Sequence, residues 1–384
     1  MRAYRSMQFP GIDMLCDRTE YNTAKQAQSV SRQYGRGGVM CEMYGVTGWA
    51  FTFEGHKGQG DWQAALGVTL RVHHLAWSSM EGEAKRDYPA CIGYQSPWYK
   101  EYKAIETHFA RVNAALTRGC PVTRIAVIHP IESFWLCAGP KDKNLEEMEY
   151  RDQAFANLTE WLLKSHIDFD FISESLFPDQ TSVEDIGAEL AVGQCSYEAV
   201  VVPNMRTIRS TTLVRLQKFA AKGGRVIFAG SVPTLVDLKP VDPPLSVSGS
   251  VTVPWSKAQI LAQLQPLRDI EMVVRESTLY RTQGYRADSL FYQMRRDGAE
   301  QFLFIANSDR KQACPVDGII KGEWKIEVRC LSRWSRIAQA HVVIGDIRCS
   351  IRCPGILGSS LQSKVEARRG SVITLTDARA YSSI

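Results

Sequence analysis

The stretch Gly38-Val-Met-Cys-Glu-Met-Tyr-Gly-Val-Thr-Gly-Trp49 and the later stretch Leu70-Arg-Val-His-His-Leu-Ala-Trp77 predict the fold of the first third of this chain. Each begins as a short apolar strand and ends in polar and aromatic side chains. In the first, two glycines break the strand, so Glu42 lies where the strand meets a loop. About one βα unit later, the second strand brings a similar group to its end: His73, His74 and Trp77. Acidic, imidazole and indole groups at successive strand ends are typical of the catalytic face of a (β/α) barrel.

These side chains suit a carbohydrate ligand, because sugars stack their C–H faces on aromatic rings and hydrogen-bond their hydroxyls to polar groups. We therefore predict that Glu42 is a catalytic carboxylate. A structural explanation stays open, in which Glu42 is a hydrogen-bonded structural acid and Trp77 belongs to the core. The residues predicted to contact the sugar are Tyr44, Trp49, His73, His74, Trp77 and Arg86.

Composition excludes several other classes of protein. The chain has 384 residues, 45% of them hydrophobic and 23% charged, which is ordinary for a globular protein with sizeable cores. The net charge of +5 is small, and Lys and Arg are scattered, so we expect no nucleic-acid partner. No apolar run approaches the roughly 20 residues of a membrane span, so we expect no membrane partner. The N-terminus lacks the apolar region of a signal peptide, and we expect a cytoplasmic protein.

The ten cysteines stand far apart and form no C-x-x-C pair. Several of them lie in apolar, strand-like runs, where a free cysteine behaves as a small hydrophobic residue. We therefore expect neither a metal site nor a disulfide framework. No glycine-rich phosphate-binding motif follows any predicted strand, so we expect no cofactor.

Residues 1–120 contain three alternations of strand and helix, which predict a parallel sheet with right-handed crossovers. The strands are expected at 9–16, 39–43 and 70–77. Helices are expected at 24–34, around 61–66, and at 99–116, where apolar residues recur at spacings of three and four.

Residues 121–240 predict a second α/β domain of flavodoxin-like size. Its strands are expected at 123–128, 169–172, 199–202 and 226–229, and its helices at 155–163 and 213–221. The charged stretch 141–151 is expected to be a loop.

Residues 241–265 are expected to be a linker, because Pro, Ser and Val are frequent there. Residues 266–384 predict a small β-sandwich, with short strands at 290–294, 301–305, 324–328, 341–344, 347–351 and 372–375. The clearest signal is Arg296-Asp-Gly-Ala299, a hairpin turn in which Asp-Gly accepts a positive φ. The predicted fold class is therefore α/β: a partial (β/α) barrel, a flavodoxin-like domain and a β-sandwich.

The chain also resembles large barrel glycoside hydrolases, namely the α-L-rhamnosidases of glycoside hydrolase family 106 and, in domain order, the β-galactosidases of family 42. The resemblance rests on six short motifs: Pro10-Gly-Ile-Asp13, Ser29-Val-Ser-Arg-Gln-Tyr-Gly35, Glu42-Met-Tyr-Gly45, Gly48-Trp49, Asp61-Trp62 and Lys85-Arg-Asp-Tyr-Pro89. It implies a barrel of the TIM type, then an amidotransferase-like domain, then a β-sandwich. The middle domain would be degenerate, because Phe228-Ala-Gly-Ser231 offers no cysteine nucleophile.

A complete barrel has eight strands, and only three precede residue 120. If these are the last three, the resemblance implies that Glu42 lies on the seventh strand as nucleophile or general base. Its partner acid would then lie on a strand that this chain lacks. Glycoside cleavage needs two carboxyl groups. The acids available as a second group are Asp13, Asp17, Glu54, Glu81 and Asp87, of which Asp17 and Glu81 are favoured by position.

Alternatives remain for several of these residues. Glu54 could instead cap a helix. His73 and His74 are adjacent on a strand, so only one of them faces the barrel interior. Arg86 and its neighbour Asp87 could form a local ion pair.

Three functions follow from these features: a glycoside hydrolase with a carbohydrate substrate, an inactive remnant of such an enzyme, and a non-catalytic carbohydrate-binding or assembly protein. The sequence leaves open whether the chain forms homo-oligomers.

Overall fold

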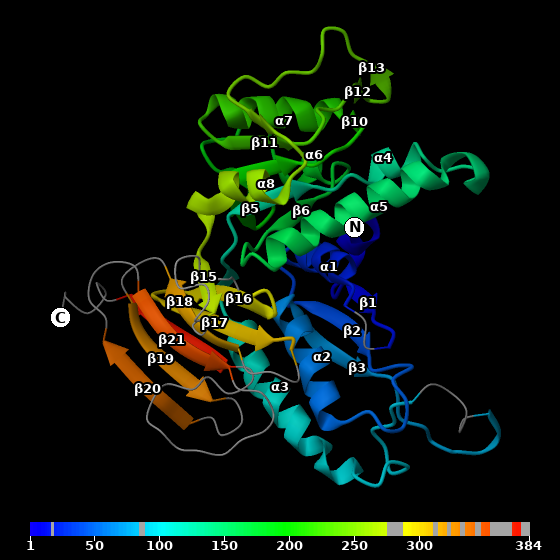
Figure 1. Ribbon diagram of the computed structural model, residues 1–384, viewed down its shortest axis with the longest axis vertical. Coiled ribbons are helices and arrows are strands. Elements are labelled where there is room, and N and C mark those ends of the chain that lie inside the picture. Colours follow the sequence, from blue (N-terminus) through cyan, green and yellow to red (C-terminus); the bar gives the residue numbers. More distant parts are fainter. Residues whose placement is uncertain are drawn as a thin grey trace.

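The computed structural model describes residues 1–16, 19–83, 89–274, 287–309, 314–320, 324–330, 335–341, 347–353 and 371–377. Figure 1 shows three groups of strands: an N-terminal sheet in blue, a middle sheet in green, and antiparallel strands in yellow to red. Parallel pairing holds in the first two groups, so this part of the chain is a mixed α/β structure as predicted.

The N-terminal sheet contains three parallel strands in the order β1-β2-β3. They are β1 (Gly11–Asp13), β2 (Val39–Met43) and β3 (Val68–His73), and the helices that follow them are α1 (Tyr21–Gln33), α2 (Phe53–Ala65), the short η3 (Tyr99–Tyr102) and α3 (Lys103–Leu116). The prediction of three βα units is confirmed. Strand β1 is shorter than predicted, since it follows Pro10, which has no N–H to donate, and Cys16 already has a positive φ of 57°.

The two faces of this sheet differ in burial. One face packs against the helices and buries Ile12, Cys41 and Val68. The opposite face carries Leu70 and Val72, which are 44% and 41% exposed. The described part of the chain therefore leaves this face of the sheet uncovered.

The middle sheet has the strand order β14-β11-β9-β5-β6, and all of its neighbouring strands are parallel. Numbered along the chain, this is the order of flavodoxin-type sheets. The strands are β5 (Ile125–Ile128), β6 (Asp170–Ile172), β9 (Ala199–Val202), β11 (Arg225–Ala229) and β14 (Val251–Val253). The accompanying helices are α4 (Ile131–Trp135), α5 (Lys141–Leu163), α6 (Phe177–Gln180), α7 (Ser210–Ala221) and α8 (Lys257–Leu264).

Two expectations for this region were wrong. The charged stretch 141–151 is not a loop, because α5 begins at Lys141 and is supported by an ion pair between Arg151 and Glu147 one turn apart. Residues 241–265 are more than a linker, because β14 extends the middle sheet beside β11. Helix α8 also buries Ile260 and Leu264 in the main core.

Smaller elements complete the part of the chain up to residue 267. They are η1 (Arg2–Ser6), the hairpin of β7 (Leu190–Val192) and β8 (Cys195–Tyr197), the small sheet of β10 (Thr207–Ile208), β12 (Leu235–Val236) and β13 (Lys239–Pro240), and η4 (Gln265–Leu267).

The remaining strands form two antiparallel sheets, with orders β20-β19-β22-β17-β16-β4 and β15-β18-β21. They are β4 (Cys120–Pro121), β15 (Ile270–Val274), β16 (Leu290–Asp297), β17 (Glu300–Asn307), β18 (Cys314–Ile320), β19 (Trp324–Cys330), β20 (Ser335–His341), β21 (Ile347–Cys353) and β22 (Ser371–Asp377). The predicted hairpin is confirmed: β16 pairs with β17, and Gly298 has a φ of 58°. Strand β4 was not predicted, and it ties the segment after α3 to β16.

The helices of the N-terminal sheet also pack on the other two groups of strands (Figure 1). Helix α1 lies against β6 and α5, while α2 and α3 lie against β16 and β17. Lys25 and Arg32 of α1 pair with Asp168 and Asp170 at the start of β6, and all four side chains are buried. These contacts hold the N-terminal sheet by its helical side.

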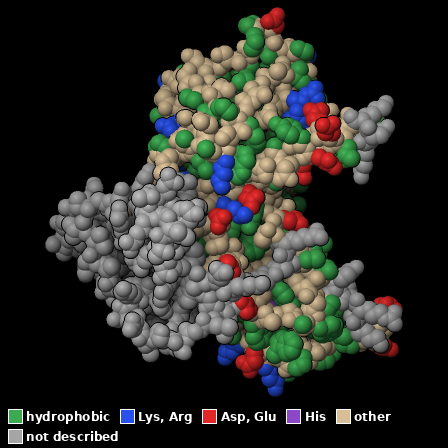
Figure 2. All heavy atoms as spheres, in the orientation of Figure 1, with side chains coloured by type: hydrophobic (Ala, Val, Ile, Leu, Met, Phe, Trp, Pro, Cys, Tyr) green, Lys and Arg blue, Asp and Glu red, His purple; other side chains and the backbone are tan. Residues whose placement is uncertain are grey.

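Acidic and basic side chains lie next to one another where the upper and lower parts of the described surface meet (Figure 2). In the described part of the chain, none of the helices is both long enough and apolar enough to cross a membrane.

Candidate functional site

Glu42 and Asp13 share the uncovered face of the N-terminal sheet. Glu42 lies near the carboxyl end of β2, where it is paired with Asp13 on β1 and with Val72 on β3. Paired residues of parallel strands point to the same face, and neighbouring strands lie about 4.8 Å apart. Both carboxylates are exposed, so the sheet brings two acids side by side at its carboxyl edge.

Cys41 lies behind these acids, on the helical face of the sheet, and is fully buried. Burial, together with the nearby negative charges of Asp13 and Glu42, raises the pKa of its thiol to about 12. The thiol is therefore protonated at neutral pH and acts as a core side chain rather than as a nucleophile.

The two adjacent histidines have different surroundings. His73 faces α3, with its Nε2 atom 3.1 Å from Oε1 of Glu106. Hydrogen bonding from His73, together with the nearby charge of Arg71, lowers the pKa of Glu106 to about 2 despite its partial burial. His73 therefore belongs to a polar contact between β3 and α3.

His74 lies just after β3 and, by the alternation of the strand, on the side of Glu42. Its ring packs against Gly45, where an added Cβ atom would lie 3.2 Å from Cγ of His74. The Nδ1 atom of His74 is buried without a hydrogen-bond partner among the described residues. Of the two histidines, His74 is the one that remains beside the candidate site.

Tyr44 lies in the core and not on the surface of the site. Its φ of 75° interrupts the strand alternation after Met43 and turns the ring inward, where it is fully buried. The hydroxyl donates a hydrogen bond to the carbonyl of His56 at 3.3 Å. The prediction that Tyr44 contacts substrate was made from its position directly after the strand, and this local backbone conformation was not visible in the sequence.

Trp49 and Trp77 lie together, with ring centroids 5.1 Å apart and planes inclined by 32°. Trp49 is 40% exposed and Trp77 is half-buried, so one indole is supported by the other. The carbonyl of Trp77 accepts a hydrogen bond from Gln95 at 2.6 Å, which fixes the loop that carries it. The pair offers an exposed aromatic surface of the kind that stacks on sugar rings.

The other predicted acids are less well placed or lie outside the described residues. Glu81 is exposed in the loop after β3, where its backbone N–H donates to the Oγ atom of Ser79. Asp17 and Arg86 lie outside the described residues. Asp13 was recognised as an available acid but was not favoured, because the sequence does not reveal that β1 and β2 pair with Asp13 opposite Glu42.

Asp61, another residue of the motifs, has a structural role. It pairs with Lys57 on its own helix and with His108 of α3, whose Nε2 lies 2.6 Å from Oδ1 of Asp61. Although burial alone would raise the pKa of Asp61, the charges of Lys57 and His108 hold it at about 2. The acid therefore fastens α2 to α3.

The middle sheet contains a second candidate position for a ligand, because flavodoxin-type sheets bind ligands where the strand order reverses. Here that point lies between the ends of β5 and β9, near Ser133 and Asn204. The cavity there measures only about 10 Å³, which leaves room for no organic ligand.

Glu174, after β6, is the most perturbed carboxyl near the carboxyl edge of the middle sheet. Burial, with a smaller contribution from the neighbouring charge of Glu132, raises its pKa to about 7. The backbone N–H of Arg209 donates to its Oε2 atom at 2.8 Å. Glu174 therefore links the segment after β6 to the start of α7 through this hydrogen bond.

In the described part of the chain, no cluster of three or more His, Cys, Asp or Glu side chains is arranged to hold a metal ion.

No known protein family matches this sequence, and no curated protein matches it. Solved structures do match the fold. A rhamnosidase from Novosphingobium sp. PP1Y is 15% identical, with a TM-score of 0.66 over 97% of this chain and 35% of that chain. In fold, the chain resembles barrel glycoside hydrolases.

Two further solved structures extend this likeness. A β-galactosidase from Bacillus circulans sp. alkalophilus is 14% identical, with a TM-score of 0.56 over 96% of this chain and 60% of that chain. An α-L-fucosidase isoenzyme 2 from Paenibacillus thiaminolyticus is 8% identical, with a TM-score of 0.53 over 93% of this chain and 63% of that chain. The chain thus spans between 35% and 63% of the length of these three structures. At these identities the likeness concerns the fold.

The raised pKa of Glu174 predicts a pH dependence of stability. The folded protein binds this proton up to about pH 7, whereas the ordinary pKa is 4.5, so the contribution to stability is full below pH 4.5 and is lost as the pH rises to 7. The loss is up to about 3 kcal/mol. Glu174→Gln removes the ionisation, so the variant should not lose this contribution as the pH rises. The unfolding free energy of the variant minus that of wild type should therefore increase from pH 4.5 to 7.

Urea unfolding at a series of pH values measures this difference, and Glu149→Gln, at an exposed position on α5, is the control. A difference between Glu174→Gln and wild type that stays constant from pH 4.5 to 7 would contradict the assignment.

Proposed function

We propose that this chain carries part of the active site of a glycoside hydrolase that cleaves O-glycosyl bonds with paired carboxylates. In this proposal, residues 1–120 are the C-terminal part of a barrel of the TIM type. An amidotransferase-like domain follows in 121–240, and a β-sandwich in 266–384. The fold likeness to a rhamnosidase, a β-galactosidase and a fucosidase supports a carbohydrate substrate.

The observation that carries the proposal is the pairing of Glu42 with Asp13 on the uncovered face of the N-terminal sheet. Hydrolysis of a glycoside requires one carboxyl group that protonates the leaving oxygen and one that attacks the sugar or activates water. Glu42 is assigned the second role. Asp13 is the described acid beside it, while Glu81 and Asp17 remain candidates for the partner.

The aromatic pair of Trp49 and Trp77 is assigned to sugar binding. Both follow strands of the same sheet, and their exposed surface would lie against the C–H face of a sugar ring. His74 is assigned to the same site, because it lies just after β3 and packs against Gly45. Arg86 remains a candidate for the same ligand.

The partial barrel limits the chemistry expected of this chain. A barrel closes with eight strands, and the N-terminal sheet has three. An acid that protonates the leaving group from the opposite side of a barrel would have to come from further strands. With only this chain, the site is expected to bind a sugar and to stabilise charge on it, but to protonate a leaving group poorly.

A second candidate function is carbohydrate binding without catalysis. The stacked tryptophans beside an uncovered sheet favour it, because they need no partner acid to bind a sugar. The two functions predict different results for the loss of Glu42. In an enzyme the loss abolishes turnover, whereas in a binding protein it has little effect on sugar affinity.

Glu42→Gln tests the catalytic role. Activated aryl glycosides, such as dinitrophenyl glycosides, are the appropriate substrates because their leaving groups depart without protonation. Turnover should fall by roughly 10²–10⁴-fold, while KM changes little, because the amide keeps the shape of the side chain and loses its charge. Release of dinitrophenolate measures the rate.

Asp13→Asn and Glu81→Gln serve as matched comparisons. If Asp13 stabilises charge beside Glu42, Asp13→Asn lowers turnover and Glu81→Gln does not. An acid that acts only by protonating the leaving group leaves the turnover of these activated substrates unchanged when it is replaced. Wild-type turnover in Glu42→Gln would eliminate Glu42 as the essential carboxylate and would favour the binding function.

Trp77→Ala tests the aromatic surface. Loss of the supporting indole should weaken sugar binding by roughly 3- to 10-fold, since aromatic contacts contribute about 0.5–1.5 kcal/mol beyond their buried area. Isothermal titration with monosaccharides, including rhamnose and galactose, measures the affinity. Trp135→Ala removes another exposed indole, on α4, and should leave the affinity unchanged. Equal affinity of Trp77→Ala and wild type would refute this placement of the sugar.

A further inference from the structure

A separate cavity of about 200 Å³ lies where α1, β4 and β16 meet. Gly38 and Gly67, which directly precede β2 and β3, line it, so it is at the amino end of these strands. Glu42 lies at the opposite, carboxyl end of β2. The cavity is therefore distinct from the candidate carbohydrate site, and what it binds does not depend on the proposed function.

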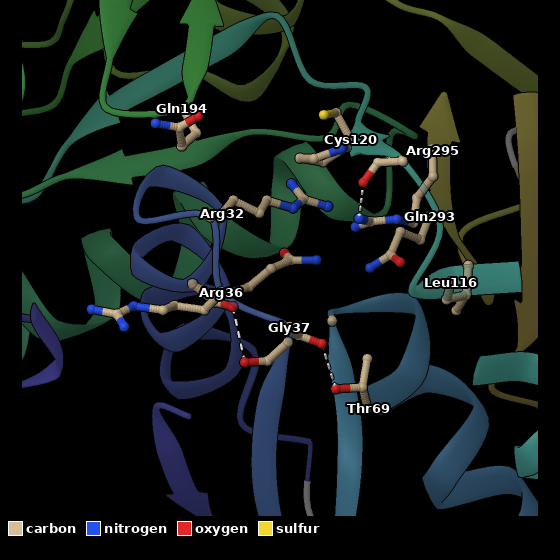
Figure 3. A pocket seen from close by; sticks show the side chains of 16 residues that line it. Arg32, Arg36, Gly37, Thr69, Leu116, Cys120, Gln194, Gln293 and Arg295 are labelled. Atoms are coloured by element: carbon tan, nitrogen blue, oxygen red, sulfur yellow. Dashed lines mark hydrogen bonds between the residues drawn. The ribbon is translucent and has the colours of Figure 1, made fainter. Parts of the chain in front are cut away.

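The charge of the cavity walls has one sign. Three arginines line the cavity, namely Arg32, Arg36 and Arg295, and none of the lining residues is acidic. Arg36 is directed away from the centre, whereas Arg32 and Arg295 point toward the same space from opposite sides (Figure 3). Gln293 also points into this space.

Arg295 has no carboxylate partner among the described residues, although it is half-buried. Its Nε atom donates to the carbonyl of Arg118 and its Nη2 atom to the carbonyl of Gly119, each at 2.6 Å. These bonds fix the guanidinium but do not neutralise it. Burial, together with the nearby charge of Arg32, lowers the pKa of Arg295 to about 10.

Arg32 and Gln28 supply buried donors that are not used. Nη1 of Arg32 lies 2.9 Å from Asp168 and 3.1 Å from Asp170, while its Nη2 atom has no partner among the described residues. Lys25 donates to Oε1 of Gln28, which fixes the amide so that Nε2 is left without a partner. An unsatisfied buried donor costs about 1–3 kcal/mol, and more when it is charged.

We propose that this cavity binds a small oxyanion of the size of sulfate or phosphate. Its volume is below the roughly 300–1,000 Å³ of pockets for organic ligands, which suits a small ion. The anion accepts hydrogen bonds from Arg32 and Gln28 and lies between the two guanidinium groups, so that their mutual repulsion becomes attraction to a shared ion. Because these groups come from α1 and β16, the bound anion fastens the N-terminal sheet to the large antiparallel sheet.

Equilibrium dialysis with labelled phosphate and thermal unfolding test this site. We expect one saturable site per chain, and a Tm that rises with phosphate or sulfate but not with chloride at the same ionic strength, because a ligand of the folded state stabilises it. Arg295→Gln should weaken binding roughly tenfold or more, since it removes the uncompensated cation. Arg296→Gln is the matched control, because this exposed neighbour on β16 does not line the cavity, and binding should be unchanged.

Gln293→Met provides a second variant in case Arg295→Gln does not fold. It changes no charge, and it should weaken phosphate binding severalfold because the Gln293 side chain points into the cavity. If a sulfated monosaccharide displaces the phosphate, the oxyanion is part of an ester. If the sulfated monosaccharide does not displace it, the ligand is the free ion. No saturable binding, or equal affinity in wild type, Arg295→Gln and Gln293→Met, would overturn the proposal.

Discussion

The buried ion network between α1 and β6 is the interaction on which the arrangement of this protein depends. Lys25 is fully buried, and its Nζ atom lies 2.9 Å from Oδ1 of Asp168. Although burial alone would raise the pKa of Asp168, the charges of Arg32 and Lys25 hold it below its ordinary value. Removing one partner from such a network leaves an uncompensated buried charge, which costs about 3–5 kcal/mol. The network therefore orients α1, and with it the N-terminal sheet, against the middle sheet.

That orientation decides which face of the N-terminal sheet is free. Contacts of α1 with β6 and of α2 with β17 occupy the helical side, where Cys41 and Val68 are buried. The opposite side, with Glu42 and Asp13 at its carboxyl edge, is covered by none of the described elements, and Leu70 and Val72 are exposed there. In a closed barrel this face would line the packed interior, and its carboxyl edge would belong to the catalytic face. The exposure of the candidate site follows from this packing.

Much of the fold could be predicted from the sequence, because hydrophobic periodicity and glycine-containing turns are local. The three βα units and the hairpin at Gly298 are examples. The charged start of α5 was missed, since a solvent-exposed helix supported by pairs such as Arg151 and Glu147 has no strong apolar stripe. The site was predicted less completely. Tyr44 was misplaced because its positive φ is a tertiary effect, and Asp13 was undervalued because strand register is a long-range property.

The central claim is that Glu42 lies in a glycosidase site whose leaving-group side this chain does not complete. The most direct test is the turnover of the purified 384-residue chain on alkyl and phenyl glycosides, whose leaving groups need protonation. The account predicts rates at the background of the uncatalysed reaction, even where the same sugar is bound. Turnover at an ordinary enzymatic rate, on the order of 1–10³ per second, would contradict it, because a three-stranded sheet would then have to supply both carboxyl functions.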